Sequence, residues 1–216
     1  MKQLTQQLKS GKMEILEVPF PALNKGAILV RNHYSVISAG TEGKTVTDAR
    51  KGYVAKAKSR KKEVKAVIEM VKSNGLLPTY KLVMNKLEAP AALGYSTAGE
   101  VIAIGEDVTA FKVGDFVACG GAGASHADVV AVPVNLVVAV PKHVDIKQAA
   151  FSTIAAIAIQ GIRQADLRMG ENCLIIGMGI IGQITYKILE ASGMYPIGID
   201  VSDAQVRQSK DAGIIN

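Results

Sequence analysis

The run Gly177-Met178-Gly179-Ile180-Ile181-Gly182 says more about the fold than any other stretch of this 216-residue sequence. The apolar residues 173–176 precede the run and predict a buried strand, and the pattern of 180–192 predicts a helix. In a turn between a strand and a helix, the first glycine of G-x-G-x-x-G permits the tight bend. The second lets the backbone approach a phosphate, and the third lets the helix pack closely on the strand.

A dinucleotide is the ligand that this context favours. Asp200 follows Gly182 by 18 residues, at the end of the next predicted strand, where a carboxylate accepts hydrogen bonds from ribose hydroxyls and repels a 2′-phosphate. NAD is therefore predicted rather than NADP. The alternative is a glycine-rich turn that binds nothing, with Asp200 acting as a helix cap. The predicted cofactor-binding residues are Gly177, Gly179, Ile180, Ile181, Gly182 and Asp200.

Outward from this turn, strands and helices alternate on the C-terminal side, with a strand at 195–200 and a helix at 203–211. This order predicts an α/β fold with the opening of a doubly wound parallel sheet. Upstream, an alanine-rich segment at 148–164 predicts a helix. Before that helix, short strands are predicted at 14–18, 27–34, 98–104, 116–119, 128–132 and 136–140. Two helical patterns between residues 44 and 87 interrupt this β-rich part.

The charge is concentrated in the helical segment. Between Lys44 and Lys86, twelve Lys or Arg residues stand against three acids, in a chain whose net charge is +6. Tyr53 and Tyr80 are the aromatic residues of this segment, too few to interleave with the charges as a nucleic-acid surface would require. A solvated helix face is therefore predicted, with neither a nucleic-acid nor a membrane partner. A polyanion-binding adaptor acting through residues 56–65 remains an alternative. The polar start and the two cysteines, Cys119 and Cys173, predict a cytoplasmic protein without a secretory signal or disulfide framework.

Two further motifs precede the glycine turn. One is Leu93-Gly94-Tyr95-Ser96-Thr97-Ala98-Gly99-Glu100-Val101, and the other is Phe111-Lys112-Val113-Gly114-Asp115-Phe116-Val117. With the dinucleotide fingerprint after them, they resemble the medium-chain dehydrogenase/reductase superfamily, the zinc-type alcohol dehydrogenase-like proteins. The resemblance implies a GroES-like catalytic-type domain at 1–147, with the basic helical insertion at about 44–88. It implies the N-terminal half of a Rossmann NAD-binding domain at 148–216.

The resemblance also shows where this chain departs from its family. In the family frame, the ligands of the catalytic zinc fall at Ala39, Tyr95 and near Thr153. Alanine has no donor atom, and neutral Tyr or Thr oxygens bind zinc poorly compared with thiolate or imidazole. We therefore expect no metal. A site built on Cys119 and His126 is disfavoured because two ligands do not complete one.

The helical insertion and the runs around Thr41 and 75–79 resemble one subgroup of the family, the bi-domain oxidoreductases. That resemblance implies a second, C-terminal oxidoreductase domain and a role in sugar or surface-polysaccharide metabolism. Only two strands of the Rossmann sheet can be found before Asn216, so we expect the sheet to be truncated. We expect this chain alone to be inactive, with an apolar sheet edge exposed. A homo-oligomer acting on a small-molecule substrate is also expected.

The resulting functional hypothesis is a zinc-independent NAD(H)-dependent oxidoreductase module, which transfers hydride to or from a carbonyl/alcohol or enone substrate. Without a metal, hydroxyl groups must polarise the substrate oxygen. Thr41 falls at the family's proton-relay position and Tyr95 at a former ligand position, so these two are the candidate catalytic residues. The alternative for them is that Thr41 caps a turn and Tyr95 fills the vacant metal site. The alternative for the whole chain is a catalytically inactive nucleotide-sensing or scaffolding domain.

Overall fold

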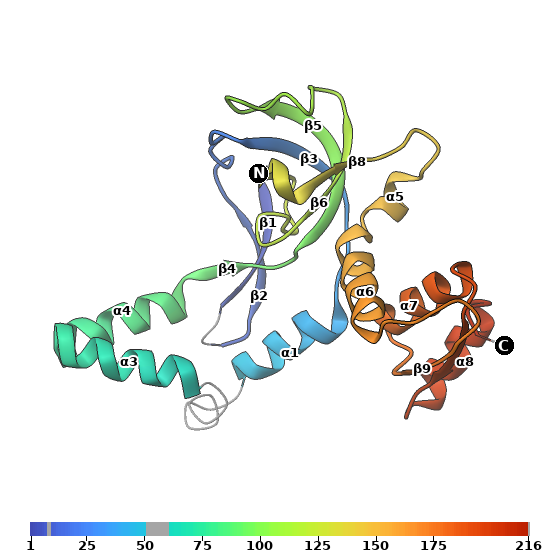
Figure 1. Cartoon of the computed structure of the whole chain (residues 1–216). Coiled ribbons are helices and arrows are strands. Elements are labelled where there is room, and N and C mark those ends of the chain that lie inside the picture. Colours follow the sequence, from blue (N-terminus) through green and yellow to red (C-terminus); the bar gives the residue numbers. More distant parts are fainter. Residues whose placement is uncertain (8–9, 51–60, 216) are drawn as a thin grey trace.

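The computed structural model describes residues 1–7, 10–50 and 61–215. A curled β-rich part lies at the centre of the molecule, a helical hairpin projects from one side of it, and an α/β part lies on the other side (Figure 1). This arrangement confirms the predicted α/β fold class with a β-rich half, a helical insertion and the opening of a parallel sheet.

The main sheet has five antiparallel strands in the order β7-β3-β5-β6-β8. Their side chains alternate between the two faces, and the inward-facing residues form a fully apolar core. Fully buried members include Ile28, Val30, Val101, Val117 and Val132. The strands are β3 (Ala27–Ser35), β5 (Ser96–Ile104), β6 (Phe116–Gly120), β7 (Val129–Pro133) and β8 (Val137–Ala139), with a short 3-10 turn, η1 (Val134–Leu136), before β8.

A second sheet of three strands joins the chain start to the end of the insertion. Strand β1 (Lys2–Gln7) lies between β2 (Met13–Glu17) and β4 (Pro90–Ala92), antiparallel to both. The sequence predicted β2 but neither β1 nor β4. Strand β1 was missed because its buried side chains include the polar Thr5 and Gln6, which break the apolar alternation that marks a strand.

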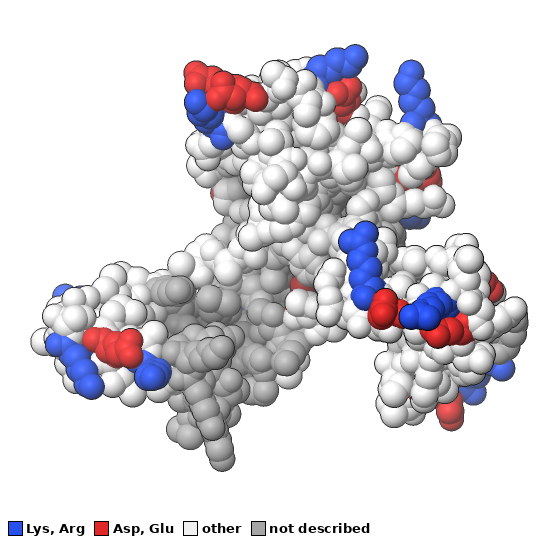
Figure 2. All heavy atoms as spheres, viewed as in Figure 1, with Lys and Arg blue, Asp and Glu red and all other residues white. Residues whose placement is uncertain are grey.

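The insertion is helical, as predicted, in its described parts: α1 (Ala39–Arg50), α3 (Lys61–Asn74) and α4 (Leu76–Glu88). Helices α3 and α4 form the projecting hairpin, on which basic and acidic side chains occur together (Figures 1 and 2). Of the proposed polyanion-binding run at 56–65, residues 56–60 lie outside the described residues. The structure therefore does not decide that alternative.

The C-terminal part contains α5 (Ile146–Ala149), α6 (Ser152–Ala165), β9 (Asn172–Ile176), α7 (Ile180–Ala191), β10 (Tyr195–Ile199) and α8 (Asp203–Asp211). Strands β9 and β10 pair in parallel, as predicted. The single helix predicted at 148–164 is instead two helices. Between them the Ala150 carbonyl accepts a hydrogen bond from Ser96 Oγ at 2.6 Å, which links this break to strand β5.

The two-stranded parallel sheet has unequal faces. On one face Ile175 packs with Met178 and Leu189 of the third apolar cluster. On the other face Leu174, Ile176, Ile197 and Ile199 share alternate positions and are exposed to between 44% and 78%. The expected exposure of apolar surface is therefore present on a face of this sheet. Within the described residues, no helix combines the length and apolar composition needed to span a bilayer.

The two cysteines should differ in reactivity. Burial raises the pKa of the Cys119 thiol to about 12, whereas Cys173 is half-buried at the start of β9. Alkylation requires the thiolate. With iodoacetamide at pH 8, mass spectrometry should find Cys173 modified at least tenfold faster than Cys119, a ratio that denaturant abolishes. Equal rates in the folded protein would contradict the buried position of Cys119.

Candidate dinucleotide and substrate site

The glycine turn has the geometry that its sequence predicts. Gly177 has a φ of 103°, which only glycine adopts readily, and its N–H donates to the Ile199 carbonyl at 2.7 Å. A Cβ atom on Gly182 would lie 1.9 Å from the Gly177 carbonyl oxygen, so any side chain there would force α7 away from the turn. At Gly179, in contrast, a Cβ atom would meet nothing within 4 Å.

The open space at Gly179 lies at the start of α7. Gly179 is the residue before this helix, and no side chain caps the helix start. The first backbone N–H groups and the positive end of the helix dipole are therefore available to an anion. Of the two residues that follow, Ile180 packs inward, whereas the side chain of Ile181 is 40% exposed. These residues fit a bound pyrophosphate.

Asp200 follows β10, and its carboxylate accepts hydrogen bonds from the glycine turn and from the residue before α8. Its Oδ2 accepts from the Met178 N–H at 2.7 Å, and its Oδ1 accepts from the Ser202 N–H at 2.8 Å. The backbone donors of Ser202 and Met178 hold the pKa of this carboxyl below its ordinary value. The carboxylate thus has a structural role, of which the helix-cap alternative for Asp200 predicted only a local part and not the bond to Met178. Each oxygen keeps further acceptor capacity for a ribose hydroxyl.

A second apolar cluster joins this turn to the β-rich part. Its buried members come from the end of β3, from β5 and β6, and from α5 and α6, and they are Val36, Ala98, Ala118, Ala149, Ala150 and Ile154. Tyr95 packs against this cluster from the loop before β5, and Ile180 and Ile184 pack against it from α7. Helix α7 is therefore packed, through Ile180 and Ile184, on the same apolar cluster that Tyr95 contacts.

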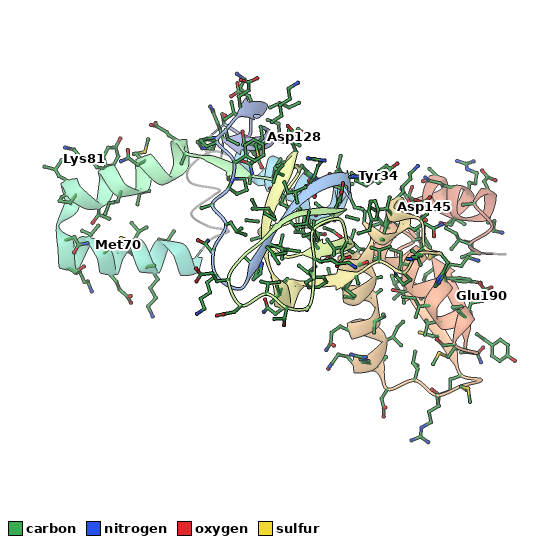
Figure 3. The ribbon with its side chains drawn as sticks, turned by 90° about the horizontal axis from the view of Figure 1, so that it is seen from above. Tyr34, Met70, Lys81, Asp128, Asp145 and Glu190 are labelled. Carbon is green, nitrogen blue, oxygen red and sulfur yellow. The ribbon has the colours of Figure 1, made fainter. Side chains whose placement is uncertain are left out.

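A cavity of about 310 Å³ lies at this junction. Its wall is formed by the end of β3, by α5 with the bend after it, and by the first residue of α7. The lining residues are Tyr34, Ser35, Val36, Ile37, Lys147, Ala150, Phe151 and Ile180. Tyr34 lies where the β-rich part meets the C-terminal helices (Figure 3). A ligand in this cavity would sit beside the helix that the glycine turn opens.

The two candidate catalytic residues occupy different surroundings. Tyr95 is half-buried against the second apolar cluster, whose Val36 and Ala150 also line the cavity. Thr41 is exposed in the first turn of α1. Both therefore stay predictions, since nothing shows either hydroxyl against a substrate.

The positions of the family's zinc ligands also have defined surroundings. Ala39 is exposed at the start of α1, and Thr153 Oγ1 donates to the Cys119 carbonyl at 3.4 Å. Among the described residues, no three His, Cys, Asp or Glu side chains are grouped so as to hold a metal ion. His126, which we weighed as a metal partner of Cys119, instead contacts a carboxylate and a hydroxyl.

Those two contacts of His126 form a network that the sequence analysis did not find. The Nε2 atom lies 3.0 Å from Glu42 Oε2 and the Nδ1 atom lies 2.8 Å from Ser35 Oγ. Glu42 comes from α1, Ser35 from the end of β3 and His126 from the loop before β7. Separations of 84 and 91 residues leave no local pattern that could have predicted the network.

Comparison with known proteins finds a family model that matches part of this chain. The family model described as "Alcohol dehydrogenase GroES-like domain" matches residues 60–142. The chain is 25% identical over 152 residues to the (R,R)-butanediol dehydrogenase of Bacillus subtilis, a match that covers 59% of this chain and 44% of that protein. The chain thus spans less than half the length of that curated relative.

Solved structures share the fold over almost the whole chain. The galactitol-1-phosphate dehydrogenase of Escherichia coli superposes with a TM-score of 0.73 at 18% identity, covering 99% of this chain and 59% of that one. The Escherichia coli quinone oxidoreductase complexed with NADPH superposes with a TM-score of 0.69 at 17% identity, covering 98% and 56%. The family model over residues 60–142 and the shared fold make this chain similar to the medium-chain dehydrogenase/reductase superfamily that its sequence motifs resemble.

Proposed function

We propose that this chain is a zinc-independent module of an NAD(H)-dependent oxidoreductase, which transfers hydride between the dinucleotide and a carbonyl/alcohol or enone substrate. The observation that carries the proposal is the turn at Gly177–Gly182, which leaves open space at Gly179 directly before an uncapped helix start. A nicotinamide dinucleotide supplies the hydride chemistry when it is bound. Residues Gly177, Gly179, Ile180, Ile181 and Gly182 would hold its pyrophosphate.

The preference for NAD rests on Asp200. Its carboxylate lies at the end of β10 with a lowered pKa, so it is charged at neutral pH and would repel a 2′-phosphate. The similar quinone oxidoreductase complexed with NADPH shows that this fold also accommodates the phosphorylated cofactor. The choice therefore depends on this one side chain rather than on the architecture.

We assign the polarisation of the substrate oxygen to hydroxyl groups instead of to a metal ion. Alanine, tyrosine and threonine at positions 39, 95 and 153 offer no thiolate or imidazole, which supports zinc independence. We assign Thr41 and Tyr95 as candidate donors to the substrate oxygen. The similarity to a butanediol dehydrogenase supports a polyol or sugar-derived substrate. The resemblance of the insertion to the bi-domain oxidoreductases supports a second oxidoreductase domain, and we place the whole protein in the cytoplasm as part of this proposal.

The competing proposal is a nucleotide-sensing or scaffolding domain without catalysis. The same three positions favour it, because loss of all metal ligands removes the family's usual means of polarising a carbonyl. The oxidoreductase and the nucleotide-sensing domain both require dinucleotide binding, so turnover distinguishes these two, whereas a scaffolding domain needs neither binding nor turnover.

Gly179→Val should abolish dinucleotide binding and leave the fold intact. Its added side chain would enter the open space beside the helix start, where it would clash with no protein atom. The same side chain would occupy the space that a bound pyrophosphate needs. We expect NADH affinity, measured by fluorescence titration, to fall at least tenfold, with an unchanged unfolding temperature. Gly161→Val in α6 is the control, because a Cβ atom there also meets nothing within 4 Å. Similar losses in both variants would refute the assigned position of the pyrophosphate.

Asp200→Asn should weaken discrimination between NADH and NADPH. Loss of the charge removes the repulsion of a 2′-phosphate, and we expect the affinity ratio to shift about tenfold toward NADPH. Because the folded pKa is lowered from 3.8, the wild-type preference should persist as the pH falls toward that value and be lost below it. The control is Asp203→Asn, an exposed acid in the first turn of α8. An unchanged ratio in Asp200→Asn would remove the basis for NAD specificity.

Turnover should survive metal chelation. We would test the full-length protein that contains this chain with NADH or NAD against polyols, sugar-derived alcohols, their carbonyl forms and quinones. Activity that EDTA leaves intact supports zinc-independent hydride transfer, whereas binding without turnover on the whole panel supports the sensing domain. For an active substrate, Thr41→Val or Tyr95→Phe should lower kcat at least tenfold. If neither variant does so, the assignment of these two hydroxyls is wrong.

A further inference from the structure

The Glu42–His126–Ser35 network runs from the protein interior to a cavity wall. The Glu42 and His126 side chains are only 11% and 7% exposed, whereas Ser35 is exposed and lines the 310 Å³ cavity at the junction with α7. The buried Glu42 and His126 side chains are thus linked by hydrogen bonds to the Ser35 hydroxyl, which is accessible from the cavity. None of these three residues is among the cofactor-binding or catalytic residues assigned above.

The hydrogen-bond directions of the network follow from the chemistry of each group. The Glu42 carboxylate only accepts, so His126 Nε2 carries the proton in this 3.0 Å contact. In the neutral imidazole, Nδ1 then has a lone pair and accepts from the Ser35 hydroxyl at 2.8 Å. This tautomer leaves the ring nitrogen that faces Ser35 free to take up a proton.

Glu42 and His126 are both held in place by the backbone. Glu42 Oε1 accepts from the Ser38 N–H at 3.0 Å, which leaves Oε2 aimed at the imidazole. The His126 N–H donates to the Leu93 carbonyl at 2.7 Å, and the Leu4 N–H donates to the His126 carbonyl at 2.8 Å. A Cβ atom on Gly94 would lie 2.9 Å from the imidazole ring, so this glycine gives the ring its space.

We propose that Ser35 is a base-activated hydroxyl that exchanges a proton with the oxygen of a substrate bound in this cavity, with His126 and Glu42 as its positioning residues. The inference rests on the proposed oxidoreductase function for the identity of the reaction. The ligand class is a small molecule with a hydroxyl or carbonyl oxygen. Apolar walls from Val36, Ala150, Phe151 and Ile180 suit its carbon skeleton, and Lys147 is the charged residue among the described lining residues.

The proton balance is complete in both directions. When an alcohol is oxidised, its O–H proton passes to Ser35 Oγ as the Ser35 proton passes to His126 Nδ1, and a bound oxidised nicotinamide dinucleotide would supply the hydride acceptor for the carbon. The imidazolium formed is paired with the Glu42 carboxylate. When a carbonyl is reduced, the imidazolium returns its proton through Ser35 to the substrate oxygen, and a bound reduced dinucleotide would supply the hydride for the carbon.

A first test needs no knowledge of the substrate. A hydroxyl with a positioned base is a better nucleophile than an ordinary serine. With p-nitrophenyl acetate, mass spectrometry should show Ser35 acetylated at least tenfold faster than exposed Ser192, whose hydroxyl bonds only the Ile188 carbonyl. His126→Gln should reduce the rate at Ser35 to that of Ser192. Equal rates at the two serines in the wild-type protein would overturn the proposal.

A second variant tests the same proposal if His126→Gln does not fold. Ser35→Cys changes an exposed position, and its thiol should ionise at lower pH than the thiol of Ser192→Cys, because a neighbouring imidazolium stabilises the thiolate. The pH dependence of iodoacetamide labelling measures this difference. Indistinguishable profiles would show that the imidazole does not act on this position.

Turnover separates this proposal from the proposed function. On any substrate that the full-length protein turns over, Ser35→Ala should lower kcat at least tenfold and leave dinucleotide affinity unchanged, with Ser192→Ala as the control. Undiminished kcat in Ser35→Ala would overturn the catalytic assignment. If labelling succeeds but the protein turns over nothing on the panel, the oxidoreductase proposal fails while the activated serine stands.

Discussion

The second apolar cluster is the contact on which the arrangement of this molecule depends. Alanines at 98, 118, 149 and 150 leave room for the strand ends, the helical bend and α7 to approach one another. Because interiors are packed as tightly as organic crystals, small side chains fix how closely these elements meet. Ile180 belongs to this contact and also follows Gly179. The same packing therefore sets the orientation of the glycine turn and of the cavity beside it.

The sequence predicted what depends on neighbours in the chain. The turn at Gly177–Gly182 follows from strand, glycine spacing and helix, all within twenty residues, and the structure confirms the sterically required glycines at 177 and 182. Strand β3 was similarly predictable, because its alternation faces an apolar core. Strand β1 was not, because Thr5 and Gln6 are buried between two strands that the chain supplies from distant segments.

The parts of the site that sequence could not predict are those made by tertiary contact. His126 looked like half of a metal site with Cys119, but Cys119 is buried in the first apolar cluster and His126 faces Glu42 and Ser35. Asp200 was predicted to be a ribose ligand, with a helix cap as the alternative, and its carboxylate accepts hydrogen bonds from the Met178 and Ser202 N–H groups. In both cases the residue type was informative, and only the folded chain shows which partner it contacts.

The polar network bears on whether this module has kept any chemistry. Burying a carboxylate and an imidazole costs desolvation energy, and apolar side chains of similar volume would join α1 to the sheet at least as well. Anchoring alone therefore does not account for the choice of residues. Anchoring also does not account for the accessible Ser35 hydroxyl at the end of the network, which lies in the wall of a cavity beside the start of α7. A proton path accounts for all three features, since it needs a carboxylate to pair the imidazolium, an imidazole to store the proton and a hydroxyl to reach the ligand.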